Sequence, residues 1–352
     1  MMPFKRVPAV ATAIAAATLG TAALVGLPAT SAQAATTSVL LPIAQYSHML
    51  VDPAHKHIFI TSGTGYSTIL VTNYSGQTVA TIPNEPGATG LALSGNGKTV
   101  YAALASGDAI SAISASTLTQ TALYSTGAGA DPTYVAWTSG RIWFGYGAAA
   151  QGGIGSIDPR TNPATVTLNA TNDPANTWYA APMLSASKNG DLVAGEPSQS
   201  PVQLASYDVS SGTATVLAPP QFININGTSA SNMESMQITP DGSDVVVASG
   251  YPYYQQIVQV SNLSEVGEYP TTTYPNSVSI SRNGTVAAGT DSSNEVFVFA
   301  AGGSTPLNTY SFGSNWLASD GVALSPNGRQ LFAITTPLPY GANPTLNIIS
   351  RS

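Results

Sequence analysis

One tight turn recurs along the chain at nearly even spacing, and this repeat limits the possible folds more than any other feature. The clearest copies are Ser325-Pro326-Asn327-Gly328, Thr239-Pro240-Asp241-Gly242 and Ser281-Arg282-Asn283-Gly284. An Asn-Gly or Asp-Gly pair suits a hairpin because glycine adopts a positive φ without steric strain, and Asn and Asp tolerate it better than other residues. Less regular copies begin at Asp52, Ser94, Thr138 and Ser187.

The seven turns divide the chain into seven similar units. Their first residues are 52, 94, 138, 187, 239, 281 and 325, so successive turns are 42 to 52 residues apart. Each turn joins two alternating apolar runs, such as 321–324 and 330–334, and third and fourth runs follow in most units, such as 69–72 and 78–82 in the first. The period of two and the abundance of Val, Ile, Thr and Tyr favour strands over helical repeats. Four antiparallel strands per unit predict an all-β, seven-bladed β-propeller.

The two ends of the chain fit a closed ring. The last unit stops after its third strand, residues 345–349, whereas a lone strand at 37–43 precedes the first full unit. An N-terminal strand that completes the last blade would pair both free edges and hide them from other chains. We therefore expect the beginning of the mature chain to close the propeller.

Two stretches carry a resemblance to a known family. Residues 321–332 (GVALSPNGRQLF) and 90–101 (GLALSGNGKTVY) resemble the repeat of bacterial YVTN-type, lactonase-like seven-bladed propellers. The resemblance implies the propeller fold over the whole mature chain, and it implies little about activity because the repeat residues are structural. The Tyr-Val-Thr-Asn box is nowhere intact, and WD40-like propellers are a poorer match because no Trp-Asp pair ends a strand.

The first 34 residues have the pattern of a secretory signal. Lys5 and Arg6 precede an apolar run over residues 7–27, and Ala32-Gln33-Ala34 supplies the small residues at which a signal peptidase cleaves. The expected organisation is a signal peptide at 1–34 and one propeller domain at 35–352, in a secreted, extracellular bacterial protein. An uncleaved anchor is the alternative, because the apolar run approaches the ~20 residues that span a bilayer.

Composition excludes several functions. Only 8% of the 352 residues are charged, the formal net charge is −7 and the sequence pI is about 4.7. A chain with 10 Lys and Arg has no basic stripe for nucleic acid. The lack of cysteine excludes disulfides, thiolate metal sites and cysteine nucleophiles. We expect a monomer that stays out of the membrane after cleavage and binds an extracellular polymer or protein.

In a propeller, residues just before the innermost strands surround the mouth of the central channel. Unit by unit these are predicted to be His48, Thr89, Asp131, Tyr179, Glu234, Asn276 and Asp320. Within this ring His48, Asp131, Glu234 and Asp320 are candidate ligands for a divalent cation such as Ca²⁺, which prefers several converging oxygen atoms. The alternative is that the Asp residues are turn residues that bond their own backbone and that no cofactor is bound.

Aromatic residues are concentrated in the same loops. The candidate ligand-binding residues are Trp178, Tyr179, Tyr251, Tyr253, Tyr254, Tyr274, Trp316 and Tyr340. Exposed aromatic rings among Asn, Gln and Thr suit stacking on sugars or contact with peptide side chains. The alternative is that some of them pack between blades or plug the channel.

Three functions remain open. The first is a non-enzymatic propeller that binds a glycan, peptide or protein of the cell envelope or extracellular space through its aromatic channel mouth. The second is a lactonase-like hydrolase or lyase that uses Glu234, Asp320 and His48 around a divalent cation. The third is an interaction platform with a shallow, plugged channel. No catalytic residue is predicted, since the chain has no Gly-x-Ser-x-Gly elbow between a strand and a helix.

Overall fold

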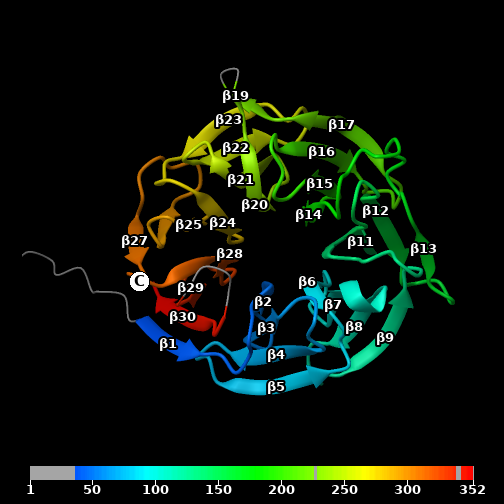
Figure 1. The fold of residues 1–352 in the computed structure, drawn as a ribbon, viewed down its shortest axis with the longest axis horizontal. Helices are drawn as coiled ribbons and strands as arrows, with labels where there is room; N and C mark the ends of the chain where they lie inside the picture. The colour runs from blue at the N-terminus through cyan, green and yellow to red at the C-terminus, as the bar shows by residue number, and fades with distance from the viewer. Residues whose placement is uncertain (1–35, 226–227, 338–341, 352) are drawn as a thin grey trace, which may run out of the picture. The chain divides into compact units, whose positions relative to one another are not determined.

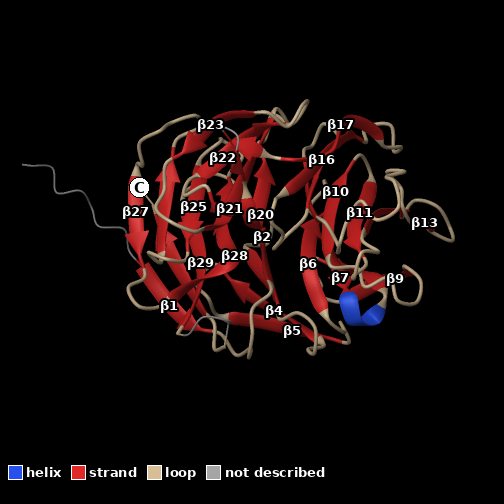
Figure 2. Ribbon diagram, turned by 45° about the horizontal axis from the view of Figure 1, so that its top comes forward, coloured by secondary structure: helices blue, strands red, loops and turns tan. Residues whose placement is uncertain are grey.

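The computed structural model describes residues 36–225, 228–337 and 342–351. They form seven four-stranded antiparallel sheets around a central axis, which confirms the predicted all-β, seven-bladed propeller (Figure 1). Strands make up nearly all of the regular structure, and the single helical turn of the described residues is η1 (Ala105–Gly107) (Figure 2). Within the same residues no helix is long and apolar enough to cross a bilayer. The predicted signal peptide lies outside the described residues.

In each blade the first strand is innermost and the fourth is outermost. Blade 1 contains β2 (His48–Asp52), β3 (His57–Thr61), β4 (Thr68–Asn73) and β5 (Thr78–Pro83). Blade 2 contains β6 (Ala88–Leu93), β7 (Thr99–Leu104), β8 (Ala109–Ser114) and β9 (Gln120–Ser125). Blade 3 contains β10 (Tyr134–Thr138), β11 (Arg141–Tyr146), β12 (Gly153–Asp158) and β13 (Thr165–Thr167). Blade 4 contains β14 (Met183–Ala186), β15 (Asp191–Gly195), β16 (Gln203–Asp208) and β17 (Thr215–Phe222). Blade 5 contains β20 (Ser231–Ile238), β21 (Asp244–Tyr251), β22 (Gln255–Gln259) and β23 (Glu265–Tyr269). Blade 6 contains β24 (Pro275–Ile280), β25 (Val286–Thr290), β26 (Glu295–Phe299) and β27 (Asn308–Ser311). A small hairpin of β18 (Asn224–Ile225) and β19 (Thr228–Ser229) links blades 4 and 5.

The N-terminal strand closes the ring, as the sequence predicts. Blade 7 consists of β28 (Trp316–Leu324), β29 (Gln330–Thr336), β30 (Thr345–Ser350) and, as its outermost strand, β1 (Thr36–Leu40). β1 pairs antiparallel with β30, with Val39 opposite Leu346. The strand is shorter than the predicted 37–43, because the chain leaves the sheet after Leu40.

Serine side chains join the innermost strands of neighbouring blades. The Oγ atoms of Ser277 and Ser279 accept hydrogen bonds from the backbone N–H groups of Val322 (2.9 Å) and Leu324 (3.0 Å) in the next blade. An innermost strand has an unpaired edge, and buried N–H groups need acceptors. The alternation of serine with apolar residues therefore serves two purposes, since the apolar residues pack between sheets while serine satisfies the free edge.

The antiparallel order gives the propeller two distinct faces. The entry face holds the links between blades and the loops between second and third strands, so each first strand begins there. The turn face holds the turns between first and second strands and between third and fourth strands. The repeated Asn-Gly and Asp-Gly turns lie on the turn face, and those predicted site residues that the structure describes lie on the entry face.

Candidate functional site

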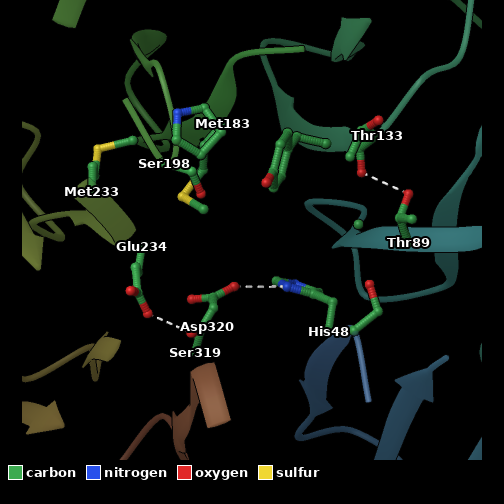
Figure 3. Close-up of a pocket in the computed structure, with 13 residues that line it drawn as sticks. His48, Thr89, Thr133, Met183, Ser198, Met233, Glu234, Ser319 and Asp320 are labelled. Carbon is green, nitrogen blue, oxygen red and sulfur yellow. Dashed lines mark hydrogen bonds and ion pairs between the residues drawn. The ribbon is translucent and has the colours of Figure 1, made fainter. Parts of the chain in front are cut away.

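The central channel opens on the entry face into a cavity of about 250 Å³. Figure 3 shows that residues of six blades line it: Ser47, His48, Thr89, Gly90, Thr133, Tyr134, Met183, Pro197, Ser198, Met233, Glu234, Ser319 and Asp320. A larger cavity of about 720 Å³ follows the innermost strands toward the turn face and shares His48, Tyr134 and Asp320 with the first. Within the described residues the mouth thus leads into the channel, unlike the shallow channel expected of a pure platform.

The side chain of Asp320 contacts residues of two other blades at this mouth. Its Oδ2 lies 2.9 Å from His48 Nδ1 of blade 1 (Figure 3). Its Oδ1 accepts a hydrogen bond of 2.6 Å from Ser235 Oγ of blade 5. The Tyr46 hydroxyl donates to the Asp320 backbone oxygen at 2.7 Å. Burial, and secondarily the charge of Asp320, raises the pKa of Tyr46 well above its usual value. A single carboxylate therefore links three blades at the channel entrance.

β-Bulges turn these side chains toward the axis. In β20, Glu234 has no partner residue in β21, whereas its neighbours Met233 and Ser235 are both paired. In β28 four residues, 318–321, lie opposite one residue of β29, and Asp320 has a φ of +50° within that bulge. Bulges redirect side chains and are common beside functional sites. The bulges are the local reason that Glu234 and Asp320 face the same cavity.

Glu234 is held by two neighbours. Its Oε1 accepts a hydrogen bond of 2.8 Å from Asn232 Nδ2, and its Oε2 accepts one from Ser319 Oγ of blade 7. Asp291 directly follows β25 and lies close enough to Glu234 for the two negative charges to repel each other. Burial is the first cause that raises the pKa of the Asp291 carboxyl to about 6, and repulsion from Glu234 is the second. Two carboxylates in this position favour a positively charged neighbour.

Three exposed tyrosines form a cluster beside these carboxylates. The ring centroids of Tyr251 and Tyr253 are 5.8 Å apart at an interplanar angle of 80°, and those of Tyr253 and Tyr274 are 6.0 Å apart. The three side chains are 37%, 48% and 47% exposed, in that order. Rings that contact each other and still face solvent provide a preformed surface for a ligand. We call these residues the tyrosine cluster.

The other predicted aromatic residues are dispersed. Trp178 is fully buried, with Nε1 donating to Asp173 Oδ2 at 3.0 Å, so its ring does not reach solvent. Tyr254 is partly buried and donates to Glu265 at 3.0 Å. Tyr179 and Trp316 are exposed, and no ring contact with described residues joins either to the tyrosine cluster. Tyr340 lies outside the described residues.

The predicted metal ligands gather only in part. His48, Glu234 and Asp320 line one cavity, while Asp131 lies outside that lining and its N–H donates to Asp108 Oδ1 at 3.0 Å. No group of three or more His, Asp or Glu residues converges to metal-binding geometry within the described residues. Both oxygens of Asp320 and of Glu234 already contact protein groups.

The ring of mouth residues differs from the predicted one in three blades. In blades 3 and 4 the lining begins at Thr133 and Met183, two and four residues after the predicted Asp131 and Tyr179. The link before β14 is long because it folds around Asp173, which accepts hydrogen bonds from Thr171, Trp178 and Tyr207. In blade 6 Asn276 is buried and donates to the Leu317 oxygen at 2.9 Å.

Asp291 was missed by sequence reasoning. It lies in a loop between second and third strands, whereas the predicted ring used only the links that precede first strands. The acidic residue in Thr290-Asp291-Ser292, at the same position in its blade as the aromatic loop 251–254, is a signal in the sequence that would have indicated it.

Comparison with known proteins supports the fold. No protein-family model and no curated protein sequence matches the chain. Among solved structures, Kuenenia stuttgartiensis hydrazine synthase is similar at a TM-score of 0.65 and 14% identity, covering 89% of this chain and 97% of that one. The β-propeller domain of Cps50 (Swd1) from Myceliophteria thermophila is similar at a TM-score of 0.65 and 12% identity, covering 91% and 100%. This chain is a β-propeller. At such identities the likeness concerns the fold alone.

Proposed function

We propose that this propeller is a non-enzymatic binding protein whose ligand site is the entry-face mouth together with the tyrosine cluster. The observation that carries the proposal is a group of three exposed tyrosines, in which Tyr253 contacts the other two, near Glu234 of a polar cavity that opens into the channel. A concave polar site with an aromatic rim is typical of ligand recognition. The ligand class we propose is an extracellular or cell-envelope glycan, peptide or protein.

The cellular setting belongs to the same proposal. The leader at residues 1–34 supports secretion, and the blade repeat supports a place among YVTN-type, lactonase-like propellers. A chain with only 8% charged residues and many Ser, Thr and Asn side chains suits contact with hydrated polymers. We propose a monomer, because β1 occupies the edge of β30 that would otherwise remain unpaired.

A glycan and peptide array tests this function. The purified chain and its Tyr253→Ala variant are applied to the same array, with Phe222→Ala as the control. Phe222 is 53% exposed on the outermost strand of blade 4, so it matches Tyr253 in exposure but lies outside the tyrosine cluster. The proposal predicts ligands that are lost in Tyr253→Ala and kept in the control. Equal signals for the three proteins would contradict it.

The alternative, a hydrolase or lyase with a divalent cation, is favoured by one observation, the meeting of His48, Glu234 and Asp320 in one cavity. The carboxylate oxygens there are already bonded to protein donors, so this arrangement does not fit a calcium site as it stands. Calorimetry with CaCl₂ decides between the two. Tight calcium binding that Glu234→Ala abolishes would support the enzyme. No heat of calcium binding would favour the non-enzymatic binding protein.

A further inference from the structure

In the part of the chain that the structure describes, lysine and arginine are confined to one face of the propeller. Eight of the ten Lys and Arg residues fall in the described part of the chain, and all eight lie on the turn face: Lys56, Lys98, Arg141, Arg160, Lys188, Arg282, Arg329 and Arg351. The entry face carries Asp108, Asp131, Glu234, Asp291 and Asp320 with no Lys or Arg among the described residues. A ligand that approaches the mouth therefore meets a negative field, which attracts cations and repels anions.

The tyrosine cluster lies near the acidic residues of the mouth. A Cβ added to Gly250 would be 3.3 Å from the Tyr274 ring and 3.5 Å from Asn232 Cβ, so Gly250 lies close to both residues. Asn232 in turn donates to Glu234 at 2.8 Å. On the other side the backbone N–H of Asp291 donates to the backbone carbonyl oxygen of Tyr274 at 3.1 Å. The charge of Glu234 raises the pKa of the Asp291 carboxyl, so these two acidic residues lie near each other and near Tyr274.

We propose that the mouth recognises an organic cation, an ammonium or guanidinium group that lies on Tyr251, Tyr253 and Tyr274 and pairs with Asp291 and Glu234. This inference rests on the proposed function and names the ligand chemistry of the same site. A cation near an aromatic face is attracted by the electrons of the ring, and tyrosine is one of the side chains that bind it well. Nearby carboxylates add direct charge pairing, and because the described part of this face has no Lys or Arg, no basic side chain there compensates the charge of these carboxylates.

The cation could come from two sources, a small quaternary ammonium compound or a lysine side chain of a peptide. Choline and the peptide N-acetyl-Gly-Lys-Gly-amide represent them. Each has a neutral partner of similar shape, 3,3-dimethylbutan-1-ol for choline and the norleucine peptide for the lysine peptide. All four are titrated into the full-length protein and followed by calorimetry. We expect one or both cations to bind about five- to thirtyfold more tightly than their neutral partners.

Variants assign the binding to this place. Asp291→Asn and Tyr253→Ala are each expected to weaken cation binding by about three- to tenfold. The controls Glu268→Gln, on the exposed outermost strand of the same blade as Tyr253, and Phe222→Ala should bind as the wild type does. Folding of every variant is checked by its thermal transition, and Asp291→Asn keeps the size of the side chain.

The pH dependence gives a second readout. Because the pKa of Asp291 is about 6, lowering the pH through 6 neutralises it, so cation affinity should fall there and the fall should be absent in Asp291→Asn. Glu234, Asp320 and His48 are the other ionisable side chains of the mouth, and the variant separates Asp291 from them. Equal binding of cations and neutral partners, or wild-type affinity in Asp291→Asn, would overturn the inference.

The outcomes separate this inference from the proposed function. If an array ligand depends on Tyr253 but is neutral and is not displaced by choline or the lysine peptide, the cation is wrong and the binding function stands. If neither the array nor the titrations give a signal that depends on Tyr253, both are wrong.

Discussion

His48 and Asp320 meet across the channel mouth, with His48 Nδ1 2.9 Å from Asp320 Oδ2, although 272 positions separate them in the chain. The contact joins the innermost strands of the first and last blades. Asp320 also accepts a hydrogen bond from Ser235 of blade 5. The carboxylate therefore shapes the mouth and connects blades that share no sheet.

Replacing this carboxylate should destabilise the propeller. We expect Asp320→Ala to lower the free energy of unfolding by about 1–3 kcal/mol, since Ser235 and His48 lose a charged acceptor in a partly buried site. Urea denaturation measures the change. A double-mutant cycle with Ser235→Ala should show coupling of at least about 0.5 kcal/mol between the two side chains. Additive effects would mean that the two residues act independently.

Ring closure can be tested at Gly76, which lies against the N-terminal strand. Gly76 has a φ of +79°, and an added Cβ would lie 2.7 Å from Val39 Cγ2 and 3.2 Å from Ile348 Cδ1. Gly97 has a similar φ of +70° with nothing within 4 Å of the added atom, so it is a matched control. We expect Gly97→Ala to cost about 1 kcal/mol through backbone strain, and Gly76→Ala about 1–3 kcal/mol more through overlap with β1. Equal losses would contradict the packing of β1 on blade 1.

The buried carboxylate of Asp173 organises the link between blades 3 and 4. Its oxygens accept hydrogen bonds from Thr171 (2.8 Å), Trp178 (3.0 Å) and Tyr207 (2.8 Å). Tyr207→Phe should lower the free energy of unfolding by about 1–2 kcal/mol, because a buried charge loses a donor. Thermal denaturation checks this. Tyr310→Phe, in which the lost hydroxyl has no partner among the described residues, should change stability by less than about 0.5 kcal/mol.

The raised pKa of Asp291 predicts that replacing this carboxyl stabilises the protein at neutral pH but not in acid. Because its pKa is about 6 in the fold and 3.8 in the reference state, the native protein binds more protons between these values, so this group lowers stability as pH rises from about 4 to 6. Asp291→Asn should therefore stabilise the protein at pH 7 by up to about 1 kcal/mol, discounted for a half-exposed site, and have little effect at pH 4.

For Asp241 we expect the opposite effect on stability, because its pKa is lowered in the fold. Hydrogen bonding, first from Thr239 and then from Ser243, lowers the pKa of its carboxyl. Its contribution is present above the unfolded pKa and lost as pH falls through the folded one. Asp241→Asn should destabilise the protein at pH 7 and lose that effect in acid. Denaturation curves at pH 7 and 4 for Asp291→Asn, and at pH 7 and well below pH 3.8 for Asp241→Asn, measure these effects, and the same sign for both variants at pH 7 would contradict the assignment.

Much of the fold follows from the sequence, because the turn repeat and the period of two determine blade number, strand order and closure. The same regularity predicts that His48, Glu234 and Asp320 meet, since a closed ring brings the beginnings of its first strands together.

The other features of the site depend on places where the structure departs from the regular blade repeat, so the repeat does not predict them. The bulges at Glu234 and Asp320 have no clear sequence mark. Trp178 is buried because Asp173 supplies an acceptor within the same link, a contact that composition cannot show. The proximity of Tyr274 to Tyr253 depends on how two loops of adjacent blades pack.

The most direct test of the binding site is NMR of the protein with ¹³C-labelled tyrosine rings, assigned by single Tyr→Phe variants. On titration with an array ligand, or with choline, the resonances of Tyr251, Tyr253 and Tyr274 should shift together with one dissociation constant, while that of the buried Tyr207 stays in place. Shifts confined to tyrosines outside the cluster, with none at Tyr253, would contradict a ligand site at the channel mouth.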